Sequence, residues 1–173
     1  MKLTWFGGTT FRLHIGGRML VVDAQSAPGG IDRTELLSGA DRTFGLWDDL
    51  PQAGEKWAPR KVAALVDAEL ELPDVLVHRL ADVAVLIEAV GEPPLVIATG
   101  AVPETGRWGR EAVVIVAGNQ LADTAKSVLN EMAPRLLAIA GGEHATDEAI
   151  EAVRDSLDGA GLMAMEPGLA LEV

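Results

Sequence analysis

The amino-acid sequence predicts an α/β (α+β) fold in which two mixed β-sheets are flanked by helices, a four-layer αββα sandwich. Short segments with alternating apolar side chains open the chain, strand and helix patterns alternate from residue 112 onward, and 49% of the 173 residues are hydrophobic. Strands followed by a β-α-β-α-β order indicate mixed sheets covered by helices. We expect one domain over residues 1–173, with two halves of about 1–95 and 96–173.

The first 23 residues are expected to form three short strands. Apolar side chains recur there at every second position, which is the period of a strand with one buried face. Gly16-Gly17 is a hairpin signal, because glycine readily adopts the positive φ angles of tight turns. A loop over residues 24–30 and a short helix from Asp32 to Leu37 are expected to follow. The three predicted strands are Leu3–Trp5, Phe11–Ile15 and Met19–Val21.

The middle of the chain is the least regular part. Residues 41–60 carry acidic side chains, tryptophans and prolines without an apolar period, so we expect a loop or an irregular crossover there. The apolar run Val62–Val66 fits either a strand or a helix. Three further apolar runs are expected to form a meander that ends at Thr99-Gly100, before a turn-rich loop over 101–110. These runs are Val75–Leu80, Val83–Val90 and Leu95–Ala98.

Strands and helices alternate in the last third of the chain. Apolar side chains at helical spacing predict one helix before Pro134 and another after Thr146. Thr146 is expected to cap the second helix, with acidic residues in its first turn, and Gly159 to end it. The predicted stripes are Leu121, Ala125, Val128, Leu129 and Met132, then Ala149, Ile150, Val153 and Leu157. The predicted strands are Ala112–Val116, Leu136–Ala140, Leu162–Met165 and Leu169–Val173.

Composition and charge limit the classes of function. Asp and Glu number 26 against 14 Lys and Arg, a formal net charge of −12. A nucleic-acid-binding protein presents a basic face to phosphate, so we expect no such partner. The absence of cysteine excludes disulfides, thiolate catalysis and cysteine-ligated zinc. The chain has no run of about 20 apolar residues and no signal-peptide pattern, so we expect a cytoplasmic protein without a membrane partner.

The opening of the chain carries a family resemblance. Met-Lys-Leu-Thr-Trp-Phe-Gly-Gly-Thr-Thr-Phe-Arg-Leu, followed by Ile-Gly-Gly-Arg-Met-Leu-Val-Val-Asp, resembles the start of metallo-β-lactamase superfamily proteins, in particular relatives of ascorbate-6-phosphate lactonase. Those relatives have a Gly-His pair before the Phe-Arg strand and Ile-Asp-Pro after the hairpin. This chain matches the pattern at Gly7 and Asp23, but has Gly8 at the histidine position and Ala24 at the proline position.

The second half resembles the metallo-β-lactamase domain of DNA-uptake proteins. Leu-Val-Ile-Ala-Thr-Gly leads in that family to an aspartate ligand, where this chain has Ala101. Ala-Val-Val-Ile-Val-Ala-Gly is similar to a strand that ends in Gly-His-His, where this chain has Asn119 and Gln120. Gly-Gly-Glu-His-Ala-Thr-Asp-Glu is similar to the Gly-His-Pro-Ser/Thr helix entry. His144 is the histidine of that entry, which usually supports the site without ligating the metal.

The resemblance implies hydrolysis by one or two zinc, iron or manganese ions that generate hydroxide near neutral pH. Such a site needs at least three protein ligands. The superfamily signature His-x-His-x-Asp-His belongs within the unmatched residues 41–72, and the sequence contains no such motif. The histidines are His14, His78 and His144, on separate predicted elements, and the first two are expected to be structural. We therefore expect no metal cofactor, with zinc as the alternative.

Other candidate sites give weaker signals. Asp41, Asp48 and Asp49 form an acidic group beside a tryptophan, which suits an oxygen-ligated cation or, more simply, a solvated loop. Asp23 is expected to accept hydrogen bonds from backbone amides at the loop entry. The serines lack a His or Lys partner at a recognisable spacing, so no nucleophile is assigned.

These observations leave three hypotheses. The first is a non-catalytic scaffold or interaction module of this fold, which would suit a homo-oligomer such as a homodimer. The second is a small-molecule binder that uses the vacated cleft at the strand ends. The third is a metal-dependent hydrolase with a reduced site made from Asp23, Asn119, His144 and carboxylates of residues 41–49. The expected cleft residues are Gly8, Asp23, Thr99, Asn119, Gln120 and His144.

Overall fold

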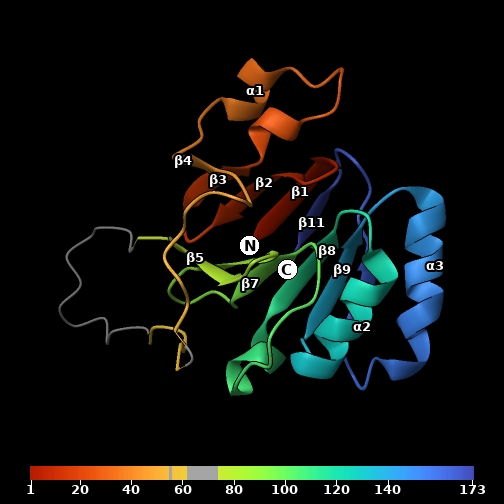
Figure 1. The fold of residues 1–173 in the computed structure, drawn as a ribbon. Coiled ribbons are helices and arrows are strands. Elements are labelled where there is room, and N and C mark those ends of the chain that lie inside the picture. Colours follow the sequence, from red (N-terminus) through yellow and green to blue (C-terminus); the bar gives the residue numbers. More distant parts are fainter. Residues whose placement is uncertain (55, 62–73) are drawn as a thin grey trace.

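The computed structural model describes residues 1–54, 56–61 and 74–173. Two β-sheets lie face to face (Figure 1), the first in the order β11-β1-β2-β3-β4 and the second in the order β10-β9-β8-β7-β6-β5. Both are mixed: β3 and β4 are parallel in an otherwise antiparallel sheet, and β7 to β10 are parallel while β5 and β6 are antiparallel. The predicted pair of mixed sheets flanked by helices is confirmed.

The elements have the following bounds. The first sheet contains β1 (Lys2–Gly7), β2 (Thr10–Ile15), β3 (Arg18–Val22), β4 (Arg42–Phe44) and β11 (Ala170–Glu172). The second sheet contains β5 (Leu76–Ala81), β6 (Ala84–Glu88), β7 (Leu95–Ala98), β8 (Val113–Ala117), β9 (Leu136–Ala140) and β10 (Gly161–Ala164). The helices are α1 (Arg33–Leu37), α2 (Leu121–Glu131) and α3 (Glu143–Val153), with 3-10 turns η1 (Ala24–Ser26), η2 (Arg107–Glu111) and η3 (Arg154–Ser156).

The predicted hairpin between β2 and β3 is present. Ile15 pairs directly with Arg18, so the turn has two residues. Those residues, Gly16 and Gly17, have φ angles of 56° and 74°, as a two-residue turn of the right twist requires. The turn fixes the register that directs Leu13 toward the second sheet.

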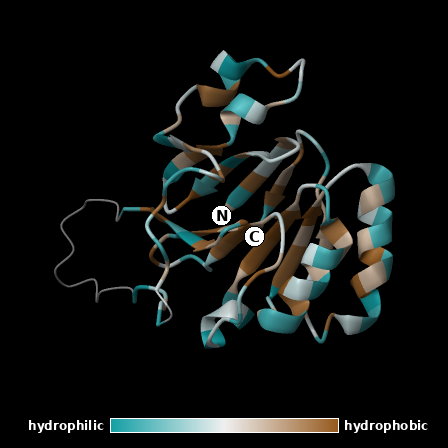
Figure 2. Ribbon diagram, viewed as in Figure 1, coloured by the Kyte–Doolittle hydropathy of each residue, from teal (hydrophilic) through white to brown (hydrophobic). Residues whose placement is uncertain are grey.

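The main core lies between the two sheets. Side chains of the first sheet meet side chains of the second there, and all of them are buried. The largest fully buried ones include Leu3, Phe11 and Leu13 of the first sheet and Ile97 and Ile115 of the second. A second cluster lies between the second sheet and the helices α2 and α3. The second sheet is therefore buried on both faces, which explains why its strands are unbroken apolar runs. Figure 2 shows these strands in the hydrophobic colour and polar residues on the exposed sides of the helices.

The helix layer on the first sheet is small. The helix α1 lies on the outer side of that sheet (Figure 1) and buries Leu36, which is 2% exposed. The Asp32 carboxylate caps it by accepting hydrogen bonds from the amides of Thr34 and Glu35, at 2.8 and 3.4 Å. No helix within the described ranges is long and apolar enough to cross a membrane.

Three local predictions were wrong. Gly159 was expected to end the last helix, but α3 ends at Val153 and is followed by the 3-10 turn η3. Part of the region expected to be irregular forms β4, which pairs parallel with β3; three residues are too few to show a period. The helix α3 begins at Glu143, after the extended cap residue Gly142, so Thr146 lies inside the first turn and donates its amide to the Gly142 carbonyl at 2.9 Å. Nothing between these positions breaks a helix. The run Val62–Val66 lies outside the described residues.

Candidate functional site

The predicted cleft residues follow strand ends at one edge of the sandwich. Gly8 follows β1, Asp23 follows β3, and Thr99 follows β7. Asn119 and Gln120 follow β8, and His144 follows β9. Because β7, β8 and β9 are parallel, their carboxyl ends share one edge. A hydrogen bond from β5 to the loop after β4 places the ends of both sheets together.

The structure brings only some of these side chains into contact. A Cβ on Gly118 would lie 3.5 Å from the Thr99 Cβ, so Thr99 adjoins the loop that carries Asn119. Asn119 and Gln120 are exposed. His144, predicted in a loop, lies in the first turn of α3, where its side chain is 91% exposed and its Nε2 atom is 3.4 Å from Glu148. These polar groups face solvent.

Asp23 lies instead in a pocket of about 340 Å³ that includes none of the other five predicted residues. Its Oδ1 atom accepts a hydrogen bond from the Leu46 amide at 2.9 Å, which confirms its expected role toward backbone amides. Its carbonyl accepts from the Thr10 hydroxyl at 3.0 Å. The residue has a left-handed φ of 48° and is 9% exposed. The pocket is lined by Asp23, Ala24, Gln25, Leu37, Thr43, Phe44, Gly45, Trp47 and Asp48.

Asp48 is the second carboxylate of this pocket. Its Oδ2 atom accepts a hydrogen bond from the Gly45 amide at 2.7 Å. A Cβ on Gly45 would lie 2.9 Å from Asp48 Oδ1 and 3.1 Å from Asp23 Oδ1. Gly45 therefore leaves room for two carboxylates to converge. The Oδ2 atom of Asp23 is buried and has no hydrogen-bond partner in the described part of the chain.

The acidic group predicted from residues 41–49 does not form. Asp41 precedes β4 and Asp48 follows it, so the two residues lie beyond opposite ends of this strand. Asp41 accepts a hydrogen bond from the Met19 amide at 2.7 Å and lies 3.5 Å from Arg18. Asp49 is exposed and lines neither this pocket nor the one around Asp41.

Sequence reasoning missed Arg79, which links β5 to the loop after β4. We call the place where Arg79 meets Leu46 and Asp48 of that loop the mouth of the two sheets. The Arg79 side chain is 7% exposed. Its guanidinium donates hydrogen bonds to the carbonyls of Leu46, of Asp48 at 2.5 Å and of Asp82 at 3.5 Å. One signal was available: Arg79 is two residues after the buried Val77, so the strand period places both on the inner face.

The loop after β4 also fills the mouth with apolar side chains. Leu46 and Leu50 are 2% and 8% exposed and belong to the core between the sheets. The backbone of Leu46 bridges the two charged groups, because its amide binds Asp23 and its carbonyl binds Arg79. The same short loop thus closes the sandwich and builds one wall of the Asp23 pocket.

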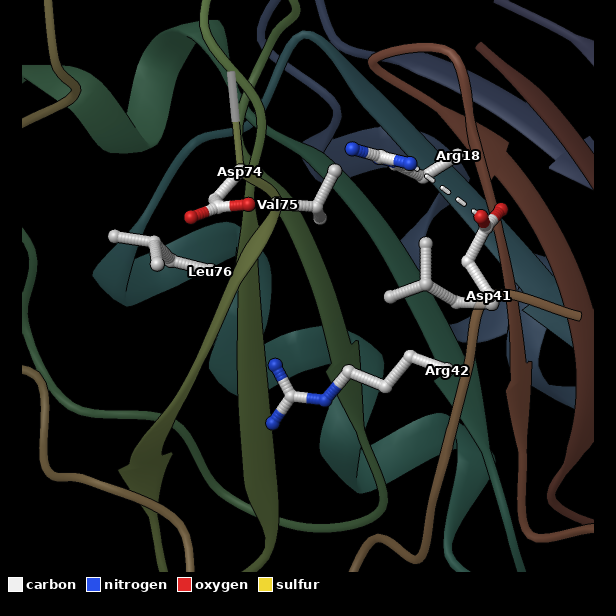
Figure 3. Close-up of a pocket in the computed structure, with 7 residues that line it drawn as sticks. Arg18, Asp41, Arg42, Asp74, Val75 and Leu76 are labelled. Carbon is white, nitrogen blue, oxygen red and sulfur yellow. Dashed lines mark ion pairs between the residues drawn. The ribbon is translucent and has the colours of Figure 1, made fainter. Parts of the chain in front are cut away.

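A second pocket, of about 370 Å³, lies at the opposite edge. It is bordered by the starts of β3, β4 and β5 (Figure 3). The figure shows the ion pair between Arg18 and Asp41, with Asp74 and the apolar Val75 facing them across the space. Two arginines and two aspartates line this pocket, so its charge favours neither anionic nor cationic ligands.

The three histidines lie apart from one another in the structure. His14 is exposed on β2. His78 alternates with the core residue Val77 and so lies on the other face of β5. His144 points into solvent. Over residues 1–54, 56–61 and 74–173, no three His, Asp or Glu side chains are grouped so that they could hold a metal ion. A zinc site needs at least three such ligands.

Comparisons with known proteins give a fold. No protein-family model matches the chain, and no curated protein does. It is similar to the isothiocyanate hydrolase from Delia radicum gut bacteria, with a TM-score of 0.60, 13% identity and coverage of 99% of each chain. It is also similar to a metallo hydrolase from the archaeon Ignicoccus hospitalis, with a TM-score of 0.56, 14% identity and coverage of 99% of this chain and 98% of the other.

A third similar structure comes from Thermotoga maritima, a protein described as a zinc-dependent hydrolase of the metallo-β-lactamase superfamily. The TM-score is 0.52, the identity is 14%, and the match covers 96% of this chain and 99% of the other. Identities this low carry the likeness of fold alone. The resemblance found in the sequence and the arrangement of the sheets thus agree: the chain has the fold of the metallo-β-lactamase superfamily hydrolases.

Proposed function

We propose that this chain is a non-catalytic protein of the metallo-β-lactamase fold, which works by binding, as a scaffold or interaction module, and takes no catalytic metal. The observation that carries the proposal is Arg79, which is 7% exposed at the mouth of the two sheets. The sequence gives a second observation. Where the families that this chain resembles carry metal ligands, it has Gly8, Ala101, Asn119 and Gln120. None of these four side chains is an imidazole or a carboxylate.

A resident guanidinium disfavours a bound metal for two reasons. Arginine stays protonated at every accessible pH, and two positive charges repel most strongly where water is excluded. The carbonyls of Leu46 and Asp48 already accept hydrogen bonds from Arg79. These two carbonyl oxygens are therefore already engaged by a cation of the chain itself.

The zinc-dependent alternative was a hydrolase with a reduced site. Its support is that similar structures are described as metal-dependent hydrolases. The geometry disfavours it, because the Oδ1 atom of Asp23 is engaged by the Leu46 amide and His144 points into solvent beside Glu148. A tetrahedral ion would need these groups and a third to converge.

Metal content tests the proposal. The protein would be purified without a chelator or a histidine tag, dialysed against zinc, iron or manganese, and analysed by plasma mass spectrometry. We expect far less than one ion per chain. One tightly retained ion per chain would overturn the proposal, and its loss in His144→Ala but not in the matched His14→Ala would place that ion at the predicted cleft.

The remaining expectations on partners are part of the same proposal. A scaffold of this kind would act in the cytoplasm as a homo-oligomer, without nucleic-acid or membrane partners, given 26 acidic against 14 basic residues. Light scattering during gel filtration would give the oligomeric state, and a monomer at high concentration would contradict it. Tight binding of labelled DNA or RNA at physiological salt would contradict the second point.

A further inference from the structure

We infer that the pocket lined by Asp23, Trp47 and Asp48 binds a small primary ammonium ion carried on an apolar body. This inference rests on the proposed function, since it assigns a ligand class to a pocket that a catalytic metal would otherwise be expected to approach. The pocket of about 340 Å³ is formed by the end of β3, the end of α1, β4 and the loop after β4.

Charge is the first argument. Asp23 and Asp48 are the ionisable residues among those that line the pocket, and no Lys, Arg or His lines it. Each carboxylate uses one oxygen for a backbone amide, from Leu46 and Gly45 respectively. The second oxygen of Asp23 is buried without a hydrogen-bond partner in the described residues. A buried carboxylate oxygen left in this state is costly unless a donor reaches it.

The arginines near the pocket are committed to other partners. Arg33 donates to the Gln25 carbonyl at 2.7 Å and to its side-chain oxygen at 3.2 Å. Arg79 is held by backbone carbonyls, and Arg42 lies over the Phe44 ring, 5.9 Å from its centre. Among the described residues, none of the three comes within 4.0 Å of a carboxylate oxygen of the pocket.

The apolar rim is the second argument. Trp47 is 61% exposed and Leu37 is 39% exposed, and both line the pocket. An indole beside two carboxylates suits an organic cation, because the ring face attracts the charge and covers the apolar body. A ligand of this class would shield these two exposed apolar side chains from water.

An ammonium ion suits the pocket better than a metal ion. Calcium takes six to eight oxygen ligands, whereas the pocket offers the second oxygens of two carboxylates. A primary ammonium group has three N–H donors, so these two oxygens and one water or carbonyl satisfy it. Carboxylate bonds to a charged donor are also stronger than those to a neutral one.

Titration with phenethylamine tests the inference. Binding would be followed by tryptophan fluorescence and by calorimetry on the full chain, with phenylethanol as the uncharged probe and phenylpropionate as the anionic probe. We expect saturable binding of the amine and none of the other two. Equal binding of phenylethanol, or no saturation by the amine, would overturn the inference. Displacement of the amine by calcium at equal concentration would instead identify a metal site and overturn it.

Three variants locate the site. Asp23→Asn keeps an oxygen for the Leu46 amide and tolerates the left-handed φ, so it removes charge with little change of structure. This variant and Asp48→Asn should each weaken amine binding about tenfold or more. The matched control Asp49→Asn, exposed and outside the pocket, should leave it unchanged. Equal weakening in all three variants would show a nonspecific charge effect and overturn the inference.

Trp47→Ala tests where the ligand lies, and the metal analysis separates this inference from the proposed function. The substitution should weaken amine binding severalfold and abolish most of the fluorescence change, since Trp47 is the exposed indole of the pocket. An unchanged fluorescence response would overturn the placement of the ligand. Retained zinc in the metal analysis would overturn the proposed function, whereas failure of amine binding in metal-free protein would overturn the pocket assignment alone.

Discussion

Replacing Arg79 by methionine removes the guanidinium at the mouth of the sheets while keeping an unbranched apolar side chain of similar reach. Two carbonyls, of Leu46 and Asp48, then lose their short hydrogen bonds. The bond to Asp82, at 3.5 Å, is long and contributes little. The loop after β4 loses its connection to β5 at these two points.

The magnitude follows from these two bonds. A hydrogen bond from a charged donor contributes about 1.5 to 3 kcal/mol net, so two contribute about 3 to 6 kcal/mol. The substitution also recovers part of this free energy, because methionine carries no charge that must lose its hydration when the chain folds. We expect Arg79→Met to lower the free energy of unfolding by about 2 to 4 kcal/mol. In a domain of this size that lowers Tm by about 4 to 16 °C.

Urea denaturation followed by circular dichroism measures this loss directly. The matched control is Arg110→Met, because Arg110 is exposed and makes no ion pair among the described residues; its change should stay within about 0.5 kcal/mol. If Arg79→Met costs no more than Arg110→Met, the guanidinium does not hold the loop, and the argument for a closed mouth is refuted.

Two further substitutions test the packing. Leu46→Ala should cost about 3 kcal/mol, since Leu46 is 2% exposed in the main core, whereas Leu37→Ala, 39% exposed, should cost under about 1 kcal/mol; equal costs in thermal melts would contradict the burial of Leu46. Gly16→Ala should cost about 1 to 3 kcal/mol, because its φ is 56° and a Cβ would lie 2.8 Å from the Ala89 Cβ. Gly29→Ala, with open space around it, should change stability by under about 0.5 kcal/mol, and a loss there as large as at Gly16 would contradict the turn geometry.

The sheets could be predicted because their sequence signals are local. The alternation around Phe11–Ile15 follows from one buried face, and the runs Leu95–Ala98 and Leu136–Ala140 follow from burial of the second sheet on both faces. Both of these runs match β7 and β9 residue for residue. The role of Asp23 toward a backbone amide was also predictable, since a carboxylate after a strand favours such bonds.

The mouth of the sheets could not be predicted, because its contacts join distant positions. Arg79 reaches carbonyls 33 and 31 residues away in the sequence. Every residue has a backbone carbonyl, so residue types do not indicate which carbonyls will accept these bonds. The position of Leu46 depends on β4, which is too short and too polar to recognise. Thr146 was misplaced for a simpler reason: threonine is a common cap, but Gly142 already provided an extended residue before an unbroken helix.

Our proposal that the chain takes no catalytic metal is tested most directly by thermal melting of the same preparation with excess zinc and with excess EDTA. A ligand at 100 times its dissociation constant stabilises a folded protein by about 2.7 kcal/mol, which would raise Tm by about 5 to 11 °C here. The closed mouth around Arg79 predicts two melting curves within about 1 °C of each other. A zinc-dependent rise of several degrees that EDTA reverses would contradict it.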